Sequence, residues 1–140
     1  MSQLIESLIE TLSKFPEIDG AWIFGSAKDG IVRPGGDVDI GVLMKKGSDC
    51  IGDIHLELQR ALNSDEIDLV DLGNCEDPIL GFEVLSGNRL LVRDVERVAE
   101  ISSLIAREYE DEMALRNDNI KRNMAAYQSR YRSKPEAPAE

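Results

Sequence analysis

The stretch that decides the fold is GAWIFGSAKDGIVRPGGDVDIG, residues 20–41. A short apolar run ends in Gly25-Ser26, and after ten further residues Asp37 and Asp39 stand at the start of a second apolar run. Carboxylates inside an apolar strand are costly to bury unless a partner compensates their charge. The pattern therefore predicts two strands joined by a loop, with a charged ligand between them.

Three carboxylates are the candidate metal ligands. Asp37 and Asp39 point to one face of their strand because side chains alternate along a strand. Asp68, in a further apolar run over residues 66–72, joins them if the two strands are neighbours, and Asp71 is the rival if the register shifts by one residue. Three acidic oxygen donors without His or Cys favour Mg²⁺ over Zn²⁺. Two such ions would stabilise the attacking and leaving oxygens of an in-line displacement.

Gly25-Ser26 is the candidate phosphate site. A glycine at a strand end lets the backbone approach a phosphate closely, and the amides that follow, with the Ser26 hydroxyl, can donate hydrogen bonds to it. A helix expected to begin near Ala27 would add the positive end of its dipole. The residues thus predict a triphosphate held between Gly25-Ser26 and the aspartates.

The rest of the chain alternates helical and extended patterns. The spacing of apolar residues predicts helices over 2–15, 50–62, 78–85, 95–109 and 118–131, and strands over 21–24, 37–44, 66–72 and 90–92. Gly87 is expected to end the third helix as a C-cap. This order predicts an α/β (α+β) fold, a mixed sheet of about four strands flanked by helices, with C-terminal helices.

Composition limits the classes of function. The chain has 140 residues and a net charge of −11, which opposes direct binding to nucleic acid but not a nucleotide held through metal ions. Cys50 and Cys75 lack a CxxC pairing and are expected to be free thiols. The N-terminus lacks a basic leader, and no apolar run approaches about 20 residues. A cytoplasmic protein without membrane contact is expected.

Gly25-Ser26, ten residues and Asp37-Val38-Asp39 resemble the GS-x10-DxD motif of the DNA polymerase β-like nucleotidyltransferase superfamily. Within it, the chain is most similar to minimal nucleotidyltransferase (MNT) proteins, the MntA-like antitoxins encoded beside HEPN-domain toxins. The resemblance covers about residues 1–110. IDLVDL matches the strand of the third carboxylate, and FEVLSGNRLLVRD resembles the helix, turn and closing strand of the family. It implies the polymerase β-like fold.

The resemblance also implies an activity, the transfer of AMP from Mg-bound ATP to a tyrosine of a cognate HEPN-type toxin, which neutralises the toxin. Asp37 and Asp39 would hold two Mg²⁺ ions, and Asp68 would ligate the catalytic ion and help to deprotonate the attacking hydroxyl. Gly25 and Ser26 would hold the β- and γ-phosphates. The expected partners are ATP and the toxin, in a hetero-complex or an oligomer.

One position departs from the family pattern. Members commonly carry Arg-Gly shortly after Gly-Ser, whereas this chain reads Ser26-Ala27-Lys28-Asp29-Gly30. Asp29 brings an acid near the expected triphosphate, and Lys28 or Arg33 is expected to compensate its charge. Lys28 and Arg33 complete the predicted nucleotide-binding set that begins with Gly25 and Ser26.

The predicted domains are a nucleotidyltransferase domain over residues 1–110, a helical extension over 111–132 and a disordered tail over 133–140. The extension carries a thin apolar stripe, which either packs within the molecule or meets a partner; its members are Ile120, Met124, Tyr127 and Tyr131. Lys45 and Lys46 are expected in a solvated turn.

Two alternative functions remain open from the sequence. One is a nucleotidyltransferase for a small molecule, although such enzymes usually need an acceptor-binding domain that this chain is too short to supply. The other is a non-catalytic antitoxin that acts by binding alone, an alternative that the acid at Asp29 keeps open. Binding of ATP that depends on a metal ion would separate the catalytic from the non-catalytic protein.

Overall fold

The structure is a computed structural model that describes the backbone of residues 2–132 and the side chains of residues 2–128. Its strands are β1 (Ile18–Phe24), β2 (Val38–Met44), β3 (Ile67–Asp71) and β4 (Asn88–Val92). They form one sheet in the order β3-β2-β1-β4. β1 runs antiparallel to β2 and to β4, whereas β2 runs parallel to β3. The predicted mixed sheet of about four strands is confirmed.

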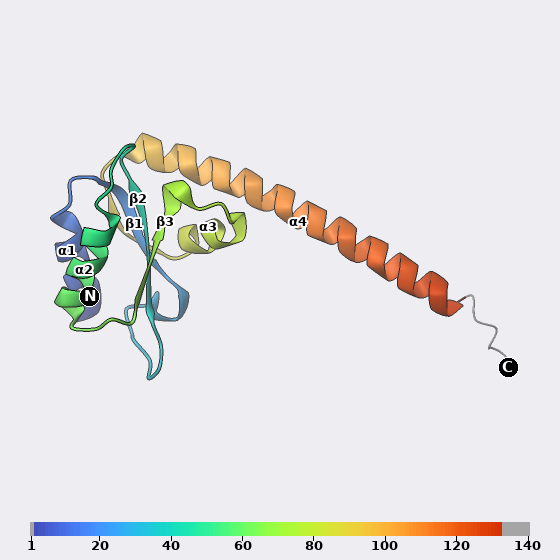
Figure 1. The fold of residues 1–140 in the computed structure, drawn as a ribbon, viewed down its shortest axis with the longest axis horizontal. Coiled ribbons are helices and arrows are strands. Elements are labelled where there is room, and N and C mark those ends of the chain that lie inside the picture. The colour runs from blue at the N-terminus through green and yellow to red at the C-terminus, as the bar shows by residue number, and fades with distance from the viewer. Residues whose placement is uncertain (1, 133–140) are drawn as a thin grey trace.

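Helices cover both faces of this sheet (Figure 1). They are α1 (Gln3–Ser13), α2 (Ile51–Leu62), α3 (Pro78–Leu85) and α4 (Val95–Arg132). On one face, Leu8 of α1 and Leu58 of α2 share a buried core with Ile40 of β2. On the other face, α3 and the first turns of α4 pack against a second core that contains Trp22 and Leu43. The sheet is therefore a rigid platform, and its loops carry the candidate site.

The central strand β1 is buried along its whole length. It begins at Ile18, three residues before the predicted start at Ala21. Asp19 can lie inside this strand because cations neutralise it: Lys45 Nζ lies 2.5 Å from one carboxylate oxygen and Arg97 Nε lies 3.4 Å from the other. Lys45, expected only in a solvated turn, is thus an ion-pair partner of a buried carboxylate.

α4 is one continuous helix of 38 residues, so the prediction of two separate helices over 95–109 and 118–131 is wrong. Residues 110–117 contain neither Pro nor Gly, and Glu112 pairs with Arg116 one turn later at 3.1 Å. Nothing in this sequence interrupts the helix. The rings of Phe82 on α3 and Tyr109 on α4 stack with their centroids 3.9 Å apart, which fixes the direction of α4.

Beyond this stack, α4 projects away from the sheet (Figure 1). Of the predicted apolar stripe, Ile120 is 58% exposed and Met124 is 52% exposed, so these two side chains do not pack into the domain. Tyr127 is also exposed, and the side chain of Tyr131 lies outside the described residues, as does the predicted tail over 133–140. No described helix is long and apolar enough to cross a membrane.

The connection from α3 to β4 depends on Gly87, but not in the predicted way. α3 ends at Ser86 with right-handed backbone angles, and Gly87 does not adopt a positive φ, so it is not a left-handed C-cap. A Cβ atom at Gly87 would instead lie 2.3 Å from the carbonyl oxygen of Ile23. Glycine is required here because the chain passes directly against the end of β1.

Candidate active site

The pairing of β2 with β3 brings two of the predicted carboxylates together. Asp39 lies opposite Asp68 in the parallel register, whereas Asp71 lies opposite Val42, farther along the sheet. Asp68 is exposed and Asp39 is half-buried. The register that we predicted from the alternation of side chains is confirmed, and the rival arrangement with Asp71 is wrong.

Asp39 is the electrostatic centre of the site. Its pKa is raised, first by burial and then by the negative charge and hydrogen bond of Asp68, with smaller contributions from Asp37 and Glu83. Asp37 lies just before β2 and is exposed, so it stands outside the strand in which it was predicted. The chain therefore gathers negative charge around one half-buried carboxylate, and a bound cation would relieve that repulsion.

The donor set fits a hard cation in part. Asp39 and Asp68 supply adjacent carboxylate oxygens of the kind that Mg²⁺ prefers. Among the described residues, however, no three or more His, Cys, Asp or Glu side chains are grouped closely enough to hold a metal ion. The role of Asp37, Asp39 and Asp68 as metal ligands therefore stays a prediction.

Gly25 lies directly against the Asp39 carboxylate. It has a φ of +73°, and a Cβ atom added to it would lie 2.2 Å from Asp39 Oδ2. The antiparallel register explains this contact, because Phe24 at the end of β1 lies opposite Asp39 on β2. The fold thus joins the Gly-Ser turn to the carboxylate pair, as the sequence predicted.

The loop after Gly25 does not begin an α-helix, so the predicted helix near Ala27 is wrong. Residues Gly25–Ala27 form a single 3-10 turn, and the chain then runs irregularly to β2. Gly30 adopts a φ of +84° and Pro34 follows, both of which oppose helix propagation. A phosphate at this turn would be recognised by individual donors rather than by a helix dipole.

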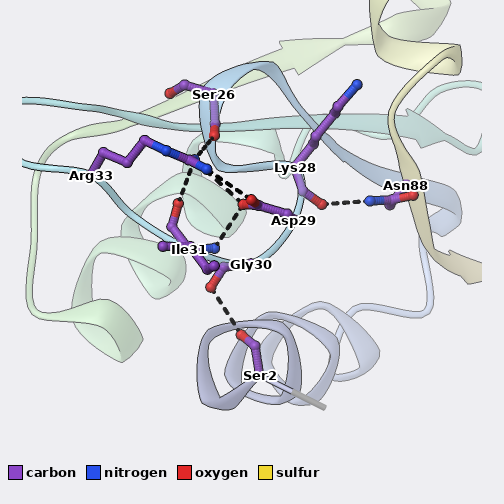
Figure 2. A network of polar contacts seen from close by, with 8 residues as sticks. All are labelled: Ser2, Ser26, Lys28, Asp29, Gly30, Ile31, Arg33 and Asn88. Atoms are coloured by element: carbon purple, nitrogen blue, oxygen red, sulfur yellow. Dashed lines mark hydrogen bonds and ion pairs between the residues drawn. The ribbon is translucent and has the colours of Figure 1, made fainter.

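Arg33 neutralises Asp29 within this loop (Figure 2). Its Nη2 atom lies 2.9 Å from Asp29 Oδ2, and its Nη1 atom donates to the carbonyl oxygens of Ser26 and Ile31. The Arg33 guanidinium holds the pKa of Asp29 below its ordinary value. Lys28 or Arg33 was expected to compensate the charge of Asp29, and Arg33 does so.

Three residues near the site had no clear signal in the sequence. Glu83 on α3 adds negative charge near Asp39, Asn88 at the start of β4 donates to the Lys28 carbonyl oxygen at 2.6 Å, and Ser2 donates to the Gly30 carbonyl oxygen at 3.0 Å. Only the folded chain brings Asn88 and Ser2 to the loop and Glu83 near Asp39. The Lys28 side chain extends away from the Asp29–Arg33 pair (Figure 2).

The chain matches a known sequence family and several solved structures. The family described as "Polymerase beta, Nucleotidyltransferase" matches residues 6–97. A toxin–antitoxin crystallised with AMP-PNP shares 24% identity over 86% of this chain and 98% of that chain, with a TM-score of 0.68. A tri-AMPylated Shewanella oneidensis HEPN toxin in complex with MNT antitoxin matches at 25% identity, over 89% and 99% of the two chains, with a TM-score of 0.65. No curated protein matches.

The family match extends over more than half of the chain and contains the Gly-Ser turn and all three aspartates. The two structural relatives share the fold over nearly their whole length. The registers of β1, β2 and β3 place the motif residues Gly25, Asp39 and Asp68 near the same end of three neighbouring strands. The chain belongs to the polymerase beta nucleotidyltransferase family.

Proposed function

We propose that this protein is an Mg²⁺-dependent adenylyltransferase antitoxin, which transfers AMP from ATP to a tyrosine of a HEPN-type toxin and so neutralises it. The observation that carries the proposal is the contact between the Gly25 backbone and the Asp39 carboxylate, with Asp68 adjacent. This geometry suits a triphosphate that is bound at the Gly25 turn and contacts, at the same place, a metal ion held by the aspartates. The relative that contains a tri-AMPylated HEPN toxin supports the choice of AMP and of the partner.

The proposed reaction uses this chain's residues as follows. The backbone at Gly25 and the Ser26 hydroxyl donate hydrogen bonds to the β- and γ-phosphates. Lys28 adds positive charge beside them, and Arg33 contributes by compensating the negative charge of Asp29. Asp68 accepts the proton of the tyrosine hydroxyl, whose oxygen forms a bond to the α-phosphorus while the bond to pyrophosphate breaks. Asp37, Asp39 and Asp68 would hold Mg²⁺, which supplies positive charge to the triphosphate and the leaving group.

The Asp29–Arg33 pair bears on the non-catalytic alternative. An unpaired acid at Asp29 would repel a triphosphate, and that repulsion was the sequence feature that kept neutralisation by binding alone open. Because Arg33 lies 2.9 Å from Asp29, the loop carries no uncompensated acid at this position. The geometry therefore favours the catalytic protein over the non-catalytic one.

We also propose that the protein is cytoplasmic, which suits ATP as its substrate. The exposed apolar side chains of Ile120 and Met124 on the projecting part of α4 suit a hetero-complex with the toxin, in which a partner covers them.

The deciding experiment is the intact mass of the neighbouring gene's product after co-expression with this protein. We expect a gain of one or more AMP masses with the native chain and none with the Asp37→Asn, Asp39→Asn double variant. An unchanged partner mass with both proteins still co-purifying would contradict adenylylation and favour neutralisation by binding. Adenylylation of an added aminoglycoside, without any change in the partner, would favour the small-molecule alternative.

Mg²⁺ is expected to raise the melting temperature of the native protein, because a cation between Asp39 and Asp68 relieves the repulsion in the folded state. The increase should grow with the Mg²⁺ concentration, as for any ligand that binds only the folded chain. Thermal denaturation of Asp68→Asn should show a smaller increase, whereas the control Asp65→Asn, an exposed acid outside the site, should respond as the native protein does. Equal responses from all three proteins would contradict a metal site at Asp68.

A further inference from the structure

We infer that Asn88 is a positioning residue for the nucleotide loop, defined here as residues 25–33. Through its side-chain amide it holds the backbone of Lys28 and, with it, the Gly25-Ser26 turn in the conformation that receives phosphate. The inference rests on the proposed binding of ATP at that turn. It assigns a role to a residue that lies outside the GS-x10-DxD motif.

The loop is held from two sides (Figure 2). Asn88 Nδ2 donates to the carbonyl oxygen of Lys28 at 2.6 Å, across 60 residues of sequence. On the other side, the Ser2 hydroxyl donates to the carbonyl oxygen of Gly30 at 3.0 Å. The same hydroxyl accepts from the Ile5 amide as the N-cap of α1, so its position is fixed. Both clamps, that is, these two hydrogen bonds, hold the loop backbone from elements outside the loop, β4 and the N-terminus of α1.

Asn88 itself is rigidly placed relative to the site. It is the first residue of β4 and lies opposite Ile23 of β1, two residues before Gly25. The preceding Gly87 passes so close to β1 that an added Cβ would lie 2.3 Å from the Ile23 carbonyl oxygen. Asn88 therefore links β4, which pairs with the end of β1, to the loop that follows β1.

The loop needs such a clamp because its backbone is intrinsically permissive. Gly25 and Gly30 both adopt positive φ, and glycine has little conformational preference of its own. The Asp29–Arg33 pair links residues within the loop, so the orientation of the loop relative to the sheet depends on contacts with other elements. Preorganising a binding loop lowers the free-energy cost of ordering it when the ligand binds. Loss of the Asn88 clamp should therefore weaken ATP binding more than it slows the chemical step.

The test compares Asn88→Ala with Asn74→Ala. Asn74 is a matched control because its Nδ2 donates to Asp71 Oδ2 at 2.7 Å, also at the surface but away from the nucleotide loop. We expect Asn88→Ala to raise KM for ATP about three- to tenfold, the effect of one lost hydrogen bond, with kcat changed by less than about twofold. Asn74→Ala should leave both constants unchanged, and Asn88→Gln, which keeps the amide, should recover part of the loss.

Amide hydrogen exchange without nucleotide supplies the second readout. We expect the amides of residues 26–30 to exchange faster in Asn88→Ala and at the native rate in Asn74→Ala. Native exchange together with a native KM in Asn88→Ala would overturn the inference, as would equal losses of kcat and melting temperature with KM unchanged. A native protein that binds no ATP would contradict the proposed function instead, because the exchange rates still report whether Asn88 holds the loop.

Discussion

Replacement of Asp39 by asparagine is expected to abolish AMP transfer and, at neutral pH, to raise the stability of the folded chain. The pKa of Asp39 is raised by burial and by neighbouring carboxylates, so the ionised group opposes folding. Asparagine keeps the shape of the side chain and removes the charge. The lost oxygen ligand should lower the transfer rate by about a thousandfold or more, since a metal ion supplies several kcal/mol of transition-state stabilisation.

The gain in stability has a defined dependence on pH. Because the pKa of Asp39 is higher in the folded chain than in the unfolded chain, the folded state binds more protons between the two values. The native protein therefore loses stability as the pH rises through this window, and Asp39→Asn does not share that loss. The advantage of the variant should be complete at neutral pH and should disappear below the ordinary aspartate pKa of about 4.

Urea unfolding at neutral pH and at about pH 3.5, below the ordinary aspartate pKa, measures both effects of Asp39→Asn. Asp65→Asn is the control because Asp65 is exposed and lies outside the carboxylate cluster. It should change neither transfer nor the dependence of stability on pH. An Asp39→Asn protein that is less stable than the native chain at neutral pH would show that the carboxylates do not repel one another. Near-native transfer by that variant would remove Asp39 from the catalytic machinery.

Sequence reasoning located the site where local rules determine the geometry. Alternation along two apolar strands sufficed to place Asp39 beside Asp68 once β2 and β3 were neighbours. The Gly-Ser turn was predicted from the need for close approach to a phosphate, and this stays a prediction; the structure places Gly25 against the Asp39 carboxylate. Both inferences needed only the period of a strand and the small size of glycine.

The errors arose where long-range contacts, or the presence or absence of helix-breaking residues, decide the structure. Glu83 and Asn88 reach the site only because α3 and β4 pack beside the end of β1, which no local pattern encodes. The helix predicted near Ala27 fails because the positive φ of Gly30 ends it and Pro34 opposes any helix over the residues that follow. α4 is continuous because the residues around 110–117, although poor in apolar side chains, lack a helix breaker.

Gly25→Ala is expected to damage the site more than any other single methyl group added to the loop. The residue has a φ of +73°, which alanine adopts at a cost of about 1 kcal/mol, and the new Cβ would lie 2.2 Å from Asp39 Oδ2. The carboxylate must therefore move away from the phosphate turn. A displacement of about 1 Å at a reacting centre lowers rates by about a hundredfold, so transfer should fall at least that far.

Gly35→Ala separates backbone strain from this contact. Gly35 lies in the same connection between β1 and β2 with a φ of +75°, but an added Cβ would have no atom within 4 Å. It should lose about as much stability from strain as Gly25→Ala and keep most of the transfer activity. Combining Gly25→Ala with Asp39→Ser should restore stability but not transfer, because the shorter side chain removes the clash together with the proposed ligand. Equal transfer by Gly25→Ala and Gly35→Ala would mean that the contact between Gly25 and Asp39 does not organise the site.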